Sequence, residues 1–285
     1  MLITLLLMFC SSMSLCMENQ AVYGVSEMQG RRRTMEDAHH VELMGEATLF
    51  GLYDGHGGRA VADSAARNLH MHCNFGKCET PSDVKRVLEE GFLQTHKNLD
   101  AASYDTQLQG STALVALIRN AQLFVANAGD SRAVLSKAGK AVALSVDHKP
   151  GSPDEKKRIE DLGGTVEIDY GVSEAPFIHC PISPLCALAV SRGLGDKGYH
   201  PYVIPNPDIQ HKTLEPDDEF LILGCDGVWD VLENQEAVDF VQEELKKNSN
   251  NFEKAAQVLR DKAHWAQSSD NITVIVVDLK HFQKQ

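Results

Sequence analysis

The chain lacks any pair of cysteines in the CxxC spacing, and its seven cysteines are an odd number. Structural zinc sites are usually marked by such closely spaced pairs, and disulfide scaffolds usually carry an even count. Neither is therefore indicated. Free thiols in a reducing compartment are the simpler interpretation.

Long runs of positive charge are missing as well. The densest is Arg31–Arg33, and 27 Lys and Arg against 40 Asp and Glu give a net charge of −13. Proteins that bind nucleic acid without specificity do so largely through Lys and Arg on phosphates. We therefore expect no nucleic-acid partner. With 43% hydrophobic and 24% charged residues, the 285-residue chain has the composition of a globular protein, and we expect a monomer.

No Lys or Arg precedes Arg31, although residues 2–10 form an apolar run. The run has the length of a signal-peptide core and is too short to cross a bilayer as a helix. Two interpretations of a leader at 1–19 stay open, a targeting or anchoring segment and a misassigned start. The first implies the secretory pathway or a membrane, and the second implies the cytoplasm or nucleus.

Residues 20–280 show no internal repeat and no low-complexity linker, which predicts one domain. Apolar runs rich in β-branched residues predict strands at 48–53, 112–118, 122–128, 132–135, 141–144, 219–224 and 271–279. Helical spacing predicts helices at 59–72, 82–100, 152–162, 234–247 and 252–266. Ser82 is a possible helix cap, and Ser152 with Glu155 resembles a capping box. Hairpins outnumber strand–helix–strand units, so antiparallel sheets packed against helices are expected.

Several acidic residues lie at the ends of these predicted strands. Asp54 and Asp226 each follow a strand and precede a glycine, Asp270 precedes the last strand, and Asp37 precedes another β-like segment. Converging carboxylates would gather negative charge that hard divalent cations such as Mg²⁺ or Mn²⁺ can neutralise. An Asp-Gly pair alone is more often a turn, so the spacing leaves both interpretations open.

The motifs in their order carry a resemblance to a known family. They are Gly30-Arg31-Arg32-Arg33-Thr34-Met35-Glu36-Asp37-Ala38-His39, Asp54-Gly55-His56-Gly57-Gly58, Ala128-Gly129-Asp130-Ser131-Arg132, Ala189-Val190-Ser191-Arg192-Gly193-Leu194-Gly195-Asp196, Asp226-Gly227-Val228-Trp229-Asp230 and Asp270-Asn271-Ile272-Thr273. Together they resemble the successive signatures of the metal-dependent serine/threonine protein phosphatases of type 2C (PPM), over about residues 20 to 280. The resemblance implies an α+β fold, with a central β-sandwich of two antiparallel sheets flanked by pairs of α-helices.

The resemblance also implies a mechanism, in which water activated by two cations, Mg²⁺ or Mn²⁺, hydrolyses phosphoserine and phosphothreonine in proteins. Asp54 would bridge the two cations and the Gly55 carbonyl would bind one. Asp226 and Asp270 would hold the first cation, and Asp37 and Glu36 would serve the second, Glu36 largely through water. Neighbouring cations lower the pKa of a shared water.

Two further residues take roles by the same resemblance. Arg32, five residues before Asp37, would bind the substrate phosphate through its planar guanidinium. His56 would protonate the leaving oxygen as general acid. Asp130 and Asp230 match positions that can hold a third, weaker cation, although a turn cap is an alternative for Asp130.

One segment departs from the family pattern. Residues 172–186 carry three prolines and two cysteines where the family has a flap of different sequence. Substrate choice is therefore open, while the metal chemistry is unaffected. Two alternative functions are a pseudo-phosphatase that acts as a binding module, and a two-metal phosphoesterase for small phosphates. The presence of all four aspartates in the metal motifs favours an active protein phosphatase.

Overall fold

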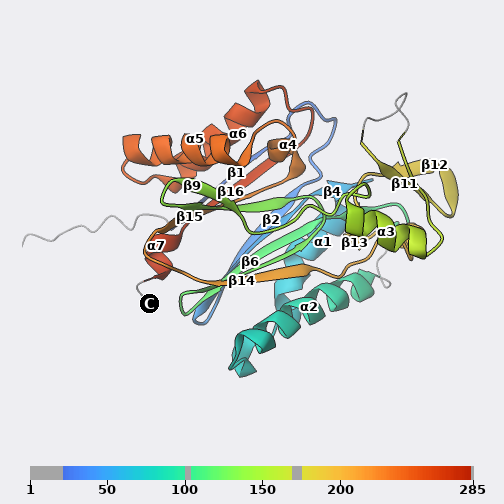
Figure 1. Ribbon diagram of the computed structural model, residues 1–285, viewed down its shortest axis with the longest axis horizontal. Coiled ribbons are helices and arrows are strands. Elements are labelled where there is room, and N and C mark those ends of the chain that lie inside the picture. Colours follow the sequence, from blue (N-terminus) through green and yellow to red (C-terminus); the bar gives the residue numbers. More distant parts are fainter. Residues whose placement is uncertain (1–21, 100–103, 169–174, 284–285) are drawn as a thin grey trace, which may run out of the picture.

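Two five-stranded antiparallel sheets form the centre of the structure, a computed structural model that describes residues 22–99, 104–168 and 175–283 (Figure 1). The leader expected at 1–19 lies outside the described residues. The first sheet has the order β1 (Tyr23–Met28), β16 (Ile272–Asp278), β15 (Asp218–Gly224), β8 (Arg132–Lys137) and β9 (Lys140–Ala143). The second has the order β14 (Asp208–Thr213), β7 (Gln122–Ala128), β6 (Ala113–Arg119), β3 (Ala47–Tyr53) and β2 (Ala38–Met44).

Helices cover the outer face of each sheet, so the layers run helix, sheet, sheet, helix (Figure 1). The second sheet is covered by α1 (Ala60–Asn68), the 3₁₀ helix η1 (Leu69–His72) and α2 (Pro81–Asn98), and the first by α4 (Asp226–Trp229), α5 (Asn234–Lys247) and α6 (Phe252–Trp265). The expected sandwich flanked by helix pairs is confirmed. Among the described residues, no helix combines the length and the apolar character needed to cross a membrane.

Three apolar cores correspond to the three interfaces between these layers. Phe50 and Leu114 of one sheet pack with Leu221 and Ile275 of the other, all fully buried. Separate cores lie under each helix pair. Removing this much apolar surface from water is the main stabilising contribution to folding. The two sheets are thereby fixed face to face, which holds their strand ends at defined positions.

Smaller elements surround one end of the sandwich. Short strands form two further sheets, ordered β10 (Val166–Glu167), β11 (Phe177–Cys180), β12 (Ser183–Leu188), and β13 (Leu194–Gly195), β5 (Gly110–Ser111), β4 (Gly55–His56). The remaining helices are η2 (Phe75–Lys77), α3 (Pro153–Asp161), η4 (Lys197–Tyr199) and α7 (Leu279–Phe282). In Figure 1, β11, β12 and α3 lie together beside the end of the sandwich.

The hairpin turns follow the sequence prediction. β6 and β7 are joined through Asn120 and Ala121, both with positive φ. β8 and β9 are joined through Ala138 and Gly139, again with positive φ. Two-residue turns of this kind match the right-handed twist of the strands they join.

Helix starts differ from the prediction in two places. The cap of α2 is Thr80, not Ser82, because Pro81 occupies the first helical position and Thr80 exchanges hydrogen bonds with Asp83. Ser152 precedes α3 but makes no side-chain cap, because the Glu155 carboxylate is bound by two arginines instead. The predicted helix 59–72 also narrows into η1 for its last turn.

Candidate active site

Four aspartates predicted from separate motifs meet around one cavity of about 380 Å³. Asp54, Asp226 and Asp270 line it, and a carboxylate oxygen of Asp37 lies within 4.8 Å of one of Asp54. The strand pairing explains the convergence. Ala38 pairs with Tyr53, which sets Asp37 beside Asp54 at one end of β2 and β3. Gly224 pairs with Val274 in the other sheet, which sets Asp226 near Asp270.

These carboxyl groups raise one another's pKa. Burial is the largest cause for Asp54, and the charges of Asp226 and Asp37 raise its pKa further. Burial together with Asp130 and Asp270 does the same for Asp226. Burial raises the pKa of Asp37 to about 6, partly opposed by its hydrogen bond from Thr273. A raised carboxyl pKa means that the ionised form lacks compensating positive charge.

Two carboxylate oxygens in this group have no hydrogen-bond partner. They are Oδ1 of Asp37 and Oδ1 of Asp226, both buried, within the part of the chain that the structure describes. Across the same residues, ion pairs with Lys or Arg reach Asp270 and Asp130 but none reaches Asp37, Asp54 or Asp226. Unpaired buried oxygens are costly. An all-oxygen donor set of this kind fits hard divalent cations.

The Asp-Asn pair at 270–271 holds the loop that carries the first motif. The Asn271 amide donates to the carbonyls of Gln29 and Thr34 and accepts from the Glu36 N–H, at 2.8 to 2.9 Å. A Cβ on Gly227 would come within 1.9 Å of the Asn271 carbonyl. Only glycine therefore lets the start of α4 approach this loop so closely.

Glu36 reaches the site from the rim. Its carboxylate accepts hydrogen bonds from the Thr34 hydroxyl, at 2.9 Å, and from the Gly58 N–H, at 3.1 Å. Gly55 lines the same cavity. A Cβ added to Gly55 would lie 2.5 Å from the Glu36 carbonyl oxygen. The structure thus brings the six predicted metal-binding residues into one region.

His56 lines the cavity and is paired with an aspartate that the sequence interpretation left without a role. Nε2 of His56 lies 2.7 Å from Oδ1 of Asp196, whose side chain is fully buried. Burial disfavours the charged imidazole, but the Asp196 carboxylate outweighs this and raises the pKa of His56. Asp196 ends the quoted Gly193-Leu194-Gly195-Asp196 motif, so its position was marked in the sequence although its partner was not.

Close backbone approach makes room for Asp196. A Cβ on Gly110 would lie 1.9 Å from its Oδ2, and Asp196 itself has φ +50. Its N–H donates to the Gln109 carbonyl at 3.1 Å. A residue held in a left-handed conformation beside a functional side chain is a feature that surrounding structure must enforce.

The three consecutive arginines separate in space. Arg32 and Arg33 line the cavity, whereas Arg31 donates to Gln267. Arg32 Nη2 lies 2.5 Å from Oδ2 of Asp270, and its side chain is 58% exposed. Arg32 is therefore placed at the cavity mouth, bound to one of the predicted metal-binding carboxylates.

The residues predicted for a third cation lie on either side of a lysine. Lys149 Nζ is 3.6 Å from Asp130 Oδ2 and 3.2 Å from Asp230 Oδ1. Asp130 is buried and lines the cavity, while the Asp230 side chain is 59% exposed. Burial raises the pKa of Asp130 to about 6, and Lys149 opposes the rise. Lys149 was not singled out in the sequence.

The atypical segment borders the cavity. Residues 169–174 lie outside the described residues, and the rest forms the β11–β12 hairpin, with a bulge near Cys180. Leu188, Ala189 and Val190, which follow the segment directly, line the cavity. Cys180 and Cys186 are both free thiols. The altered sequence therefore leads into the rim of the cavity without lining it among the described residues.

Comparison with known proteins decides the family. The protein phosphatase 2C family model matches residues 21–272. The chain belongs to the protein phosphatase 2C family. The predicted resemblance is confirmed, and the enzyme class is protein serine/threonine phosphatase. The pseudo-phosphatase alternative gains no support from the family match or the relatives.

Named relatives agree with the family assignment. The chain is 41% identical over 263 residues to "Probable protein phosphatase 2C member 13, mitochondrial" of Oryza sativa subsp. japonica, covering 90% of this chain and 68% of that protein. It is 37% identical over 268 residues to "Probable protein phosphatase 2C 45" of the same organism, covering 92% and 88%. The crystal structure of serine-threonine phosphatase 2C from Toxoplasma gondii superposes with a TM-score of 0.77 at 23% identity, covering 90% and 94%, and shows the shared fold.

Proposed function

We propose that this phosphatase 2C member hydrolyses phosphoserine and phosphothreonine in proteins with the help of two divalent cations, Mg²⁺ or Mn²⁺. The supporting observation is that Asp37, Asp54 and Asp226 lie around the same cavity. Among the described residues, no Lys or Arg forms an ion pair with any of the three. Such a group is unfavourable in the ion-free protein and favourable once cations bind.

The residues present fit the cations. Asp54 would serve both ions: it lies beside Asp37, and burial together with the charges of Asp226 and Asp37 raises its pKa. Asp226 and Asp270 would hold one ion. Asp37, the Gly55 carbonyl and Glu36 would serve the other, Glu36 through water. When bound, the cations would lower the pKa of a water and offset charge on the phosphoryl oxygens.

The chain's own residues orient and protonate the substrate. Asp196 holds Nε2 of His56 and favours the protonated ring. Nδ1–H of that imidazolium would then donate its proton to the serine or threonine oxygen as the P–O bond breaks. An alkoxide is a poor leaving group, so this proton transfer is worth about 100-fold or more in rate.

Arg32 is proposed to bind the phosphate of the substrate. Its present partner, Asp270, is one of the proposed cation ligands. A cation held by Asp270 would compete with this ion pair and leave the guanidinium free to bind phosphate in the cavity that it already lines. Its planar fork then suits two phosphoryl oxygens at once.

A third, weaker cation between Asp130 and Asp230 remains part of the proposal. Lys149 now supplies the positive charge there, so an ion would have to displace its ammonium group. This competition provides a physical reason for weak binding. We propose phosphorylated proteins as substrates, a monomeric enzyme, and a cytoplasmic or nuclear location, with a secretory, membrane or organellar location as the alternative; one relative's name specifies mitochondria.

The test is hydrolysis of p-nitrophenyl phosphate and of a phosphothreonine peptide during a Mn²⁺ titration. We expect no turnover in EDTA, saturable recovery with Mn²⁺, and loss of turnover in Asp54→Ala. Asp239→Asn, an exposed carboxylate on α5 that accepts from Gln235, is the matched control. Tight phosphopeptide binding without turnover would instead support the binding module, and preference for nucleotides would support a small-phosphate esterase.

A further inference from the structure

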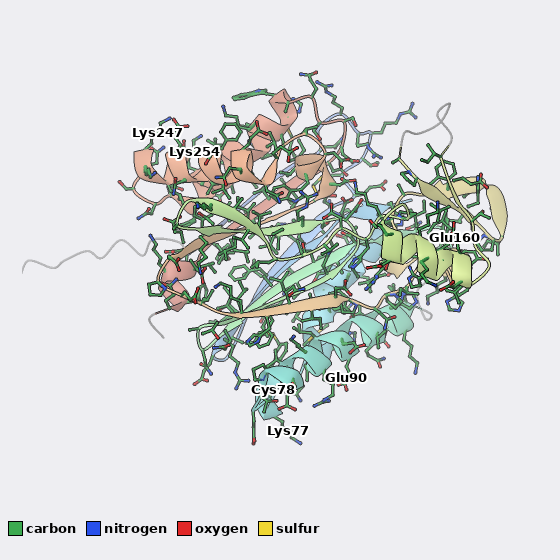
Figure 2. All side chains as sticks on the ribbon, in the orientation of Figure 1. Lys77, Cys78, Glu90, Glu160, Lys247 and Lys254 are labelled. Carbon is green, nitrogen blue, oxygen red and sulfur yellow. The ribbon has the colours of Figure 1, made fainter. Side chains whose placement is uncertain are left out.

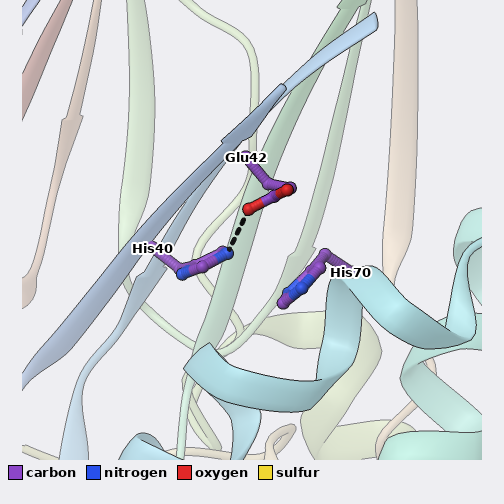
Figure 3. A group of neighbouring side chains, drawn as sticks. All are labelled: His40, Glu42 and His70. Carbon is purple, nitrogen blue, oxygen red and sulfur yellow. Dashed lines mark ion pairs between the residues drawn. The ribbon is translucent and has the colours of Figure 1, made fainter. Parts of the chain in front are cut away.

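Two histidines and a glutamate gather on the outer face of the second sheet, away from the carboxylates of the active site. His40 and Glu42 are two residues apart on the edge strand β2, so their side chains leave the same face of the strand. His70 comes from η1, which follows α1. Figure 3 shows the three side chains pointing toward one another from these two elements.

The cluster lies on the helix side of the sheet. His39, the neighbour of His40 on β2, points to the opposite face and pairs with Glu27 of β1, in the other sheet. His40 instead stacks on the His70 ring, with centroids 4.3 Å apart and planes at 18°. Along β2, Glu42 lies five residues beyond Asp37, a distance of about 17 Å for extended chain.

The three side chains offer one donor atom each within 4.8 Å of one another. Nε2 of His40 lies 3.3 Å from Oε2 of Glu42. Within the described residues, this Nε2 and Nδ1 of His70 are buried side-chain nitrogens without a well-aligned hydrogen bond, and their neighbours are the Glu42 carboxylate and, for the His70 ring, the backbone of Ala66. Buried polar atoms are normally satisfied. Two such nitrogens beside a carboxylate therefore point to a ligand that accepts their lone pairs.

The cluster can be reached from solvent. Glu42 and His70 line an open hollow of about 570 Å³ between the end of β2 and η1. The Glu42 side chain is 43% exposed. An ion can therefore reach the Glu42 carboxylate from the hollow, and the two buried nitrogens would have to turn toward it.

We propose that His40, Glu42 and His70 bind one Zn²⁺ ion at a site separate from the catalytic centre. Two imidazole nitrogens and one carboxylate oxygen are a donor set that zinc favours, whereas Mg²⁺ and Mn²⁺ prefer oxygen alone. Zinc–ligand distances of about 2.0–2.1 Å bring tetrahedral ligands about 3.3 Å apart. Donor atoms that now lie within 4.8 Å of one another must therefore close by at most roughly 1.5 Å, with the stacked rings turning so that their in-plane lone pairs converge.

Binding would join the edge strand β2 to the helix layer. η1 and β2 lie far apart in the sequence, and the ion would link them directly through His70 and His40. A ligand that binds only the folded state stabilises it in proportion to its affinity and concentration. The inference does not depend on the proposed phosphatase mechanism, because no substrate is involved in it.

The test is a Zn²⁺ titration of the full chain against a chromophoric chelator, with Mg²⁺ in excess to occupy the catalytic carboxylates. We expect the wild type to bind one equivalent of Zn²⁺ tightly. His70→Gln and Glu42→Gln should each lower the Zn²⁺ affinity of that site by about 100-fold or more, since even loss of a residue that supports a ligand costs 10–100-fold in metal affinity. Replacing Zn²⁺ by Co²⁺ should give the strong visible absorption of a four-coordinate site, also lost in both variants.

Matched controls keep this result specific. His72→Gln changes another histidine of η1, whose ring is bonded to Thr95 and Asn98, and Glu46→Gln changes another carboxylate of the same hollow. Both should retain the wild-type equivalent. The equivalent should also persist in Asp54→Asn, which removes a catalytic carboxylate. Absence of a tight equivalent in the wild type, its loss in Asp54→Asn, or its retention in Glu42→Gln would overturn the proposal.

Discussion

Two acidic sites near the same end of the sandwich differ in the charges that surround them and in the direction in which their pKa values shift. Around Asp54, carboxylates face one another and their pKa values rise. Around Glu155, two arginines surround one carboxylate: Arg192 donates to Oε1 at 2.7 and 3.0 Å, and Arg158 to Oε2 at 2.7 Å. Burial works against the ionised form of Glu155, but these donors lower its pKa to about 2.

The contrast separates structural charge from functional charge. Arg192 lies two residues after Val190, which lines the active-site cavity. Arg192 also pairs with Asp208 of β14 at 2.8 Å. The Glu155 group therefore ties α3, the loop after β12 and a sheet edge together with internal counter-ions. Among the described residues, the Asp54 group has such counter-ions on Asp270 and Asp130 but none on Asp37, Asp54 or Asp226, where the proposed cations would supply the positive charge. Figure 2 draws the side chains on the ribbon and labels Glu160 on α3, the helix that carries Glu155.

The largest expected effect comes from removing the proposed bridging carboxylate. Asp54→Ala should lower kcat/KM by about 1,000-fold or more, at least ~4 kcal/mol of transition-state stabilisation. Steady-state kinetics with saturating Mn²⁺ measure it, with Asp239→Asn as control. Turnover by Asp54→Ala within tenfold of the wild type would contradict the proposal that the Asp54 group binds the catalytic cations.

The next effect separates proton transfer from metal chemistry. His56→Gln and Asp196→Asn should each reduce kcat on a phosphothreonine peptide, by about 100-fold for His56 and by less for Asp196, which acts through the ring. With p-nitrophenyl phosphate, whose leaving group needs no proton, both losses should shrink to a fewfold. Equal losses on the two substrates would show that these residues serve folding or metal binding instead.

A third prediction concerns the structural side of the comparison. Because the pKa of Glu155 is lowered from 4.5 to about 2, its ionised form stabilises the fold above pH 4.5. That stabilisation is lost as the pH falls toward 2. Glu155→Gln should reduce the free energy of unfolding at pH 7 by about 3 kcal/mol.

The pH dependence gives the control for this effect. The free energy of unfolding of the wild type, measured with urea, should fall as the pH drops from 4.5 to the onset of acid unfolding. Glu155→Gln should lack this decrease. Asp154→Asn, an exposed neighbour on α3, should behave as the wild type does. A variant that keeps the wild-type acid dependence would show that the arginine clamp contributes nothing.

The smallest expected effect tests the arginine at the cavity mouth. Arg32→Ala should raise KM about tenfold, or ~1.4 kcal/mol, with a smaller change in kcat. Arg31→Ala removes a neighbouring guanidinium that contacts Gln267 instead and should leave KM unchanged. If Arg33→Ala raises KM and Arg32→Ala does not, the phosphate clamp belongs to Arg33.

The sequence predicted much of this arrangement because its signals were local. Strand ends followed by Asp-Gly, and the hairpins that join β6 to β7 and β8 to β9, depend on neighbouring residues alone. The pairing of His56 with Asp196 could not be predicted, because 140 residues separate them and only the fold brings them together. The same holds for Glu155, which helical spacing assigned to a capping box although distant Arg192 binds it. The site roles by family resemblance stay proposals.

The most direct measurement is thermal unfolding of the wild type and Asp54→Asn at pH 7, in EDTA and in Mn²⁺. In EDTA, Asp54→Asn should melt about 2–3 °C above the wild type, because about 1–2 kcal/mol of carboxylate repulsion is removed. With Mn²⁺ at about 100 times its Kd, the wild type should gain roughly 2.7 kcal/mol and the variant much less. An Asp54→Asn variant that melts below the wild type in EDTA, or that gains as much from Mn²⁺, would contradict the account.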